Sequence, residues 1–155
     1  MKKRFGSIVL LGFTLLTASS VLVHPFGAIK AQGSSKPLLL DATFDPQVEK
    51  IVERSCQNCH SDRTEWPWFS YLAPISWMIE NDVQRGRSQM NLSRWNGYSP
   101  EKQQKILSEM SMLVRNRAMP LPRYLLLHPE AKLSDAEVTY LYEWARSERR
   151  YATKR

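Results

Sequence analysis

The chain has 155 residues, enough for one domain with a hydrophobic core, and its net charge is +7. Hydrophobic residues make up 43% and charged residues 24%, which excludes a collagen-like, low-complexity or wholly disordered chain. The positive charge lies near the two ends: no acidic residue precedes residue 32, and a second basic cluster closes the chain. Because the middle is nearly neutral, the charge does not indicate a nucleic-acid-binding protein.

Residues 1–31 have the order of an export signal, with basic residues at 2–4 followed by an apolar stretch from Ile8 to Val23. Cleavage after Ala28 or Ala31 is one expectation. Neither site is a clean A-x-A, so an uncleaved membrane anchor is the alternative. Both outcomes place the rest of the chain outside the cytoplasm, in the periplasm or another extracytoplasmic space.

Beyond a short linker at 32–41, strand signals are scarce and helix signals recur, so we expect one all-α domain over 42–150 and a basic tail at 151–155. Cap residues, apolar periodicity and breakers predict its helices. They are expected over 46–57, over 74–84 with a stop at Arg85-Gly86-Arg87, over 99–117 after a loop at 91–97, and from the Ser134/Glu137 capping box onward.

The two cysteines fall in the sequence Cys56-Gln57-Asn58-Cys59-His60. This C-x-x-C-H arrangement is typical of covalent haem attachment, because two thiols at this spacing reach the vinyl groups of one porphyrin edge while the adjacent imidazole binds the iron. We therefore expect one covalently bound haem c, with Cys56 and Cys59 as attachment points and His60 as an iron ligand.

Three other interpretations of the motif fit the sequence less well. A zinc site needs four ligands, and the chain offers few besides these three. A thioredoxin-type redox pair belongs at the start of a helix in a βαβ unit, whereas this pair closes a helix. A disulfide between Cys56 and Cys59 would close a tiny loop and leave His60 unexplained.

The second iron ligand is less strongly indicated. Met119 is our first candidate, because it follows the third predicted helix in a segment stiffened by Pro120 and Pro122. His128 is the alternative, and an open distal site is the third possibility. Methionines such as Met78 and Met110 lie on helix stripes, where methionine is usually core.

From helix through C-x-x-C-H and a Met-Pro loop to the final helix, the chain resembles a class I cytochrome c. More closely, residues 42–150 resemble the haem-binding domain family of bacterial exported proteins. The matching segments are Cys59-His60-Ser61, Trp66-Pro67-Trp68, Ala73-Pro74-Ile75-Ser76-Trp77, Gly86-Arg87, Asn91-Leu92-Ser93-Arg94-Trp95, Met119 to Tyr124 and His128 to Ser134. The resemblance implies a small helical domain around haem, with its last helix packed across its first.

Further residues are candidates for contact with the haem. The tryptophans Trp66, Trp68 and Trp77 come soon after His60 and would form one wall of the pocket or pack in the core. Arg87 is our first candidate for binding a haem propionate, ahead of Arg63, Arg85 and Arg94, because the guanidinium fork suits a carboxylate.

The sequence therefore predicts an exported monohaem electron carrier that is not an enzyme and whose partners are redox proteins of unknown identity, with a possible membrane tether and no nucleic-acid partner. Coordination by two protein ligands favours electron transfer over catalysis. The alternatives are a haem enzyme or haem-based sensor with an open or labile distal site, and a small binding module whose haem is structural.

Overall fold

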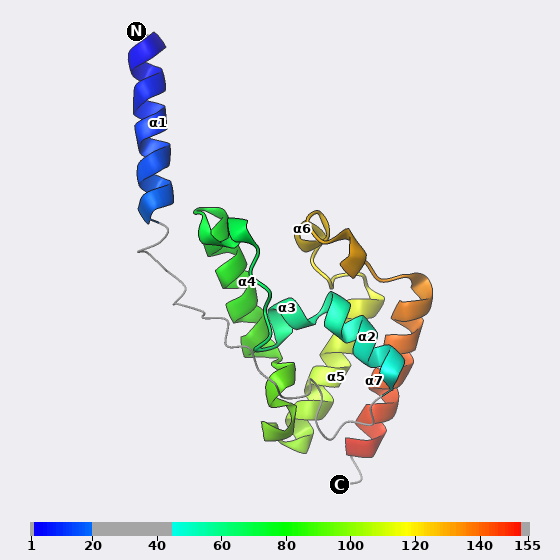
Figure 1. The fold of residues 1–155 in the computed structure, drawn as a ribbon. Coiled ribbons are helices and arrows are strands. Elements are labelled where there is room, and N and C mark those ends of the chain that lie inside the picture. The colour runs from blue at the N-terminus through cyan, green and yellow to red at the C-terminus, as the bar shows by residue number, and fades with distance from the viewer. Residues whose placement is uncertain (1, 20–44, 153–155) are drawn as a thin grey trace.

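The computed structural model describes residues 2–19 and 45–152, and every regular element in those ranges is helical, as expected (Figure 1). The α-helices are α1 (Lys2–Ser19), α2 (Pro46–Ser55), α3 (Gln57–His60), α4 (Ile75–Gln89), α5 (Pro100–Arg115), α6 (Pro122–Leu125) and α7 (Asp135–Ala152). Short 3-10 helices lie at η1 (Trp68–Tyr71), η2 (Leu92–Gly97) and η3 (Pro129–Ala131).

Three of the four predicted helix starts are confirmed by their caps. The Asp45 side chain accepts a hydrogen bond from the Gln47 N–H at 2.7 Å, and Ser99 caps α5 through the Lys102 N–H at 3.3 Å. Ser134 and Glu137 form the reciprocal capping box of α7.

One predicted helix end is wrong. α4 does not stop at residues 85–87 but continues to Gln89, so Gly86 lies inside the helix. The loop expected over 91–97 contains the 3-10 helix η2. α1 covers the basic residues and the apolar stretch of the predicted signal as far as Ser19, whereas the rest of that stretch, the expected cleavage positions and the 32–41 linker lie outside the described residues. Among the described residues, no helix has both the length and the hydropathy needed to cross a membrane.

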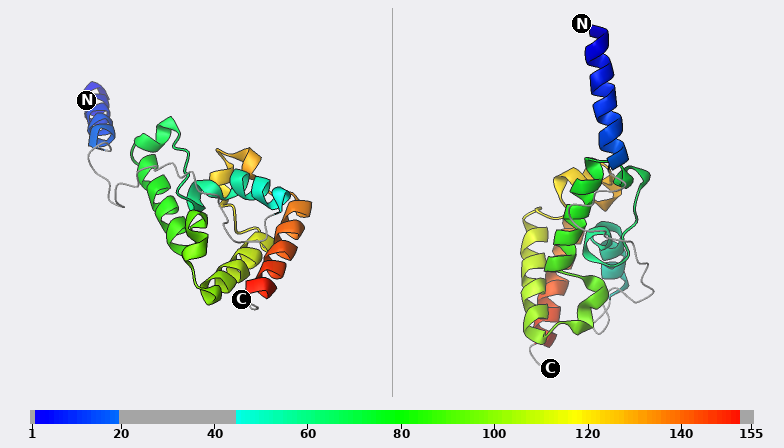
Figure 2. Two further views of the ribbon diagram at one scale, coloured as in Figure 1. Left: turned by 60° about the horizontal axis from the view of Figure 1, so that its bottom comes forward. Right: turned by 90° about the vertical axis from the view of Figure 1, so that its left-hand side faces the viewer.

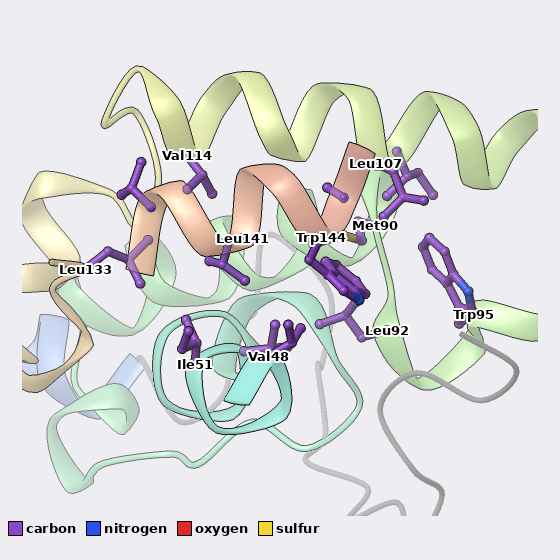
Figure 3. Packing of buried hydrophobic residues seen from close by; sticks show 14 residues of the cluster. Val48, Ile51, Met90, Leu92, Trp95, Leu107, Val114, Leu133, Leu141 and Trp144 are labelled. Atoms are coloured by element: carbon purple, nitrogen blue, oxygen red, sulfur yellow. The ribbon is translucent and has the colours of Figure 1, made fainter. Parts of the chain in front are cut away.

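The core forms where α5 and α7 pack together and α2 crosses α7 (Figures 1 and 2). Leu141 of α7 lies between Ile51 of α2 and Val114 of α5, and all three are at most 3% exposed (Figure 3). The two ends of α2 are also tied to α7 by polar contacts. Tyr140 donates to the Asp45 carboxylate at 2.5 Å, and Arg54 pairs with Glu137 at 2.7 Å.

The last helix therefore packs across the first helix of the domain, as the resemblance implied. This crossing matters for the site, because α2 ends directly before Cys56 and the core fixes where that end lies.

Candidate haem site

The predicted attachment motif begins at a break between two helices, at Cys56, and continues as the single helical turn α3. α2 ends at Ser55, and Cys56 has a non-helical backbone with φ −126° and ψ −34°. The His60 N–H then donates to the Cys56 carbonyl at 3.0 Å, which closes the turn of α3. The short turn thus holds both thiols and the imidazole in one compact segment.

Both cysteines are free thiols and half-buried. Burial raises the pKa of Cys56 to about 12 and the pKa of Cys59 to about 11, and the Asp82 carboxylate adds to the shift of Cys59. The thiols are therefore protonated at neutral pH. Thiol–disulfide exchange relies on a thiolate of lowered pKa, so this environment does not favour a thioredoxin-type redox pair.

The zinc alternative receives no support either. Across residues 2–19 and 45–152, no three His, Cys, Asp or Glu side chains come together as a metal-binding group. A structural zinc ion needs four such donors.

A backbone carbonyl fixes the orientation and the proton of the His60 ring. Its Nδ1 lies 3.2 Å from the Met90 carbonyl, and because a carbonyl only accepts, Nδ1 carries the proton in this hydrogen bond. Nε2 then keeps its lone pair. Burial lowers the pKa of His60, partly offset by bonds to backbone carbonyls, so the ring is neutral at pH 7. A neutral imidazole anchored through its other nitrogen is the usual form of a metal-binding histidine.

Gly86 lets α4 lie directly against this turn. A Cβ at Gly86 would come within 2.5 Å of the Cys59 carbonyl oxygen and 3.2 Å of the Cys59 Cβ. Only a residue without a side chain permits this approach. The glycine that the sequence marked as a helix breaker is therefore the packing contact between α3 and α4.

Arg87, next to Gly86, fixes the loop that follows His60. Its Nε donates to the Ser61 carbonyl and one terminal nitrogen donates to the Thr64 hydroxyl, both at 2.9 Å. The Thr64 hydroxyl in turn donates to the Asn58 carbonyl at 2.6 Å. The structure gives Arg87 this positioning role, while its predicted contact with a propionate stays a prediction.

Asn58, the second variable residue of the motif, joins three segments. Besides the Thr64 contact, its Oδ1 accepts from the Glu65 N–H at 3.0 Å, and its Nδ2 donates to the Tyr124 hydroxyl at 3.0 Å. Asn58 thereby connects α3 to the following loop and to α6.

α6 is also bound to α4. Arg123 pairs with Asp82 at 2.5 Å and 2.9 Å in a two-pronged ion pair. Together, the Arg123–Asp82 and Tyr124–Asn58 contacts hold α6 against both α4 and α3, and we call these two contacts the α6 clamp. Burial raises the pKa of Tyr124, and its hydrogen bond with Asn58 offsets part of that shift.

The two candidates for the second ligand lie on either side of α6 in the sequence. Met119 is half-buried between the end of α5 and α6, and its N–H donates to the Leu113 carbonyl at 3.3 Å. The His128 ring stacks on Tyr124 with centroids 4.3 Å apart, and its Nδ1 lies 3.2 Å from a Glu130 carboxylate oxygen. The choice between them stays a prediction.

The three predicted wall tryptophans differ in exposure. Trp68 is 75% exposed, whereas Trp66 and Trp77 are half-buried. The Trp66 Nε1–H is buried without a hydrogen-bond partner. A buried donor of this kind costs free energy unless it finds an acceptor, and a carboxylate such as a propionate would supply one.

Apolar side chains remain exposed on the elements that surround α3. They are Trp68, Tyr71, Leu72, Ile75 and Met78 from η1 to α4, and Leu126 and Leu127 after α6. α4 and α6 lie on either side of α3 (Figures 1 and 2). By contrast, the cavity beside Cys56 has a volume of only about 10 Å³, which is too small for a porphyrin. The thiols, the prepared imidazole, the orphaned donor and this apolar surface together fit a haem.

Comparison with known families agrees with this chemistry. The family described as "Haem-binding domain" matches residues 19–147. The chain belongs to the haem-binding domain family. The match includes the described domain up to residue 147 of α7, so haem binding is the general property of this chain.

A curated relative is similar over a shorter stretch. The chain is 25% identical over 102 residues to the cytochrome c peroxidase Ccp of Escherichia coli (strain K12), a match that covers 64% of this chain and 22% of the relative. The chain thus spans less than a quarter of that relative's length. No solved structure matches the chain.

Sequence reasoning did not identify the residues that position the motif: Asn58, Asp82, Gly86, Arg123 and Tyr124. Gly86 and Tyr124 lie in the segments that match the family, and this match was the only indication of their importance. Arg123 also lies in one of these segments, but its pairing with Asp82 could not be predicted, because an ion pair between residues 41 positions apart cannot be read from spacing.

We predict that Gly86→Ala destabilises the folded domain, because the new methyl group must displace either the Cys59 carbonyl or α4 itself. The expected loss is about 1–3 kcal/mol in the free energy of unfolding, measured by urea denaturation, with less haem incorporated. Gly97→Ala is the matched control, since nothing lies within 4 Å of a Cβ there. Equal stability of the two variants would contradict the close approach of α3 and α4.

Proposed function

We propose that this chain is an exported monohaem c-type cytochrome that transfers single electrons. The observation that carries the proposal is the α3 turn, in which Cys56, Cys59 and His60 lie together and the Nδ1 bond to Met90 leaves Nε2 for iron. Cys56 and Cys59 would hold the haem through thioethers, and His60 would be its proximal ligand. When bound, the haem iron supplies reversible one-electron transfer.

Met119 is the proposed second ligand. The α6 clamp supports this role, because it ties the segment directly after Met119 to α3 and α4. A ligand on a segment held at both sides changes position little between redox states. Two protein ligands leave no coordination position for a substrate, which favours electron transfer over catalysis.

The remaining side chains would set the environment of the iron. Apolar residues on η1, α4 and α6 would exclude water, which favours the ferrous state because the ferric state carries more positive charge. Trp66, Trp68 and Trp77 are the proposed pocket aromatics, with Trp66 Nε1–H and Arg87 as donors to the propionates.

Location and partners follow from the same proposal. Haem attachment of this kind takes place outside the cytoplasm, which agrees with the basic and apolar order of residues 2–23 as a signal or anchor. We propose a periplasmic or membrane-tethered protein that exchanges electrons with other redox proteins.

A haem enzyme or haem-based sensor with an open or labile distal site is the second candidate. The similarity to a cytochrome c peroxidase favours it, although the match covers 22% of that protein. Occupancy of the distal position separates the two functions, and the Met119 variant described below tests it.

Replacing both Cys56 and Cys59 by Ala should abolish covalent attachment, because no other thiol is present in the chain. The measurement is haem staining after denaturing electrophoresis of protein exported from a host that matures c-type cytochromes. Met112→Ala, an exposed position on α5, is the control and should stain like the unaltered protein. Staining of the double variant would refute the proposed attachment.

Met119→Ala should convert low-spin iron to high-spin iron and lower the reduction potential, because thioether ligation favours the ferrous form. The visible spectrum and a redox titration measure both effects, and Met112→Ala again serves as control. If the spectrum is unchanged, Met119 is not the ligand, and His128→Ala then tests the alternative.

A further inference from the structure

The carbonyl that fixes the His60 ring belongs to a peptide group with a second polar contact. This group joins Met90 to Asn91, with the Met90 carbonyl at one end and the Asn91 N–H at the other, and we call it the bridging peptide. The carbonyl lies 3.2 Å from His60 Nδ1, and the Asn91 N–H donates to the Tyr98 hydroxyl at 2.9 Å. His60 and Tyr98 are therefore connected through one peptide group.

The bridging peptide is held in place on both sides. The Met90 N–H donates to the Gly86 carbonyl at 2.9 Å, where α4 ends, and the side chains of Met90 and Leu92 belong to the hydrophobic core (Figure 3). The Tyr98 ring packs edge-on against Trp95, with centroids 6.3 Å apart, and Trp95 is part of the same core. The packing thus fixes the positions of both the peptide and the tyrosine.

The Asn91 side chain ties the bridging peptide to the residues that follow His60. Its Oδ1 accepts from the Ser93 N–H at 3.0 Å, and its Nδ2 donates to the Asp62 carboxylate at 2.9 Å. The Ser93 hydroxyl accepts from the Asp62 N–H at 3.0 Å. Because Asn91 is only 2% exposed, its backbone N–H relies on the Tyr98 hydroxyl rather than on solvent for an acceptor.

Hydrogen bonds at the two ends of a peptide group strengthen each other. When the Asn91 N–H donates to Tyr98, electron density moves toward the Met90 oxygen, which becomes a better acceptor. A stronger hydrogen bond from His60 Nδ1 makes the imidazole a more basic ligand at Nε2. A more basic ligand stabilises ferric iron more than ferrous iron, because ferric iron carries the greater charge.

We propose that Tyr98 is a positioning residue that lowers the reduction potential of the haem iron through the bridging peptide and His60. The inference rests on the proposed function, since it requires an iron bound to His60. It gives the site two opposing influences: the apolar side chains favour the ferrous state, and the contact between Tyr98 and the bridging peptide favours the ferric state.

Tyr98→Phe tests the inference, because it removes the hydroxyl and keeps the ring that packs on Trp95. In the full-length haem-loaded protein, the potential should rise, so that the ferrous-to-ferric ratio at a fixed solution potential increases about twofold or more. For a one-electron couple this corresponds to about 20 mV. Spectroelectrochemistry measures the potential.

Tyr140→Phe is the matched control. It also removes one tyrosine hydroxyl and one hydrogen bond, to Asp45, but at the crossing of α2 and α7. Its potential should equal that of the unaltered protein.

The sign of the change separates this role from a purely structural one. A loosened segment around Asn91 would admit water to the haem, which stabilises the ferric state and lowers the potential. A potential that falls or stays the same in Tyr98→Phe, or that rises equally in Tyr140→Phe, would overturn the inference.

Proton NMR of the reduced protein provides a second readout. The resonance of the His60 Nδ1 proton should move upfield in Tyr98→Phe, because a weaker hydrogen bond deshields the proton less, and should stay in place in Tyr140→Phe. An unmoved resonance in Tyr98→Phe would contradict the link through the bridging peptide. An unaltered protein without haem would overturn the proposed function as well, whereas haem-loaded variants with equal potentials would overturn this inference alone.

Discussion

The close packing of α4 on α3 is the constraint on which the haem site depends. An isolated helix of a single turn is not stable in water, so contacts outside α3 must fix where Cys59 and His60 lie. Gly86 allows the backbones to meet, and the Met90 carbonyl, directly after α4, fixes the proton on His60. The elements that hold the motif in place therefore also prepare its imidazole for a metal.

The same region links the two sides of the proposed pocket. Asn58 bonds to the loop after His60 and to Tyr124, and Asp82 of α4 pairs with Arg123. Movement of α6 would thus disturb α3 and α4 together. In the proposed cytochrome, this coupling fixes the second ligand relative to the attachment turn. The structural change that accompanies electron transfer is therefore small.

Much of the fold could be predicted from local sequence signals. Asp45, Ser99 and Ser134 marked helix starts because capping is a local interaction, and apolar periodicity marked the core faces of α2, α5 and α7. The predicted end of α4 is wrong, because the low helix propensity of glycine favours a break, whereas Gly86 packs against Cys59 from inside the helix. The motif was readable from spacing, but its supports depend on contacts between distant residues such as Asp82 and Arg123.

The central claim is that a haem is bonded to Cys56 and Cys59 of this chain. The most direct measurement is the mass of the intact protein, denatured and purified after export from a host that builds c-type cytochromes. The account predicts the mass of the polypeptide plus one haem. A mass equal to that of the bare polypeptide would contradict it.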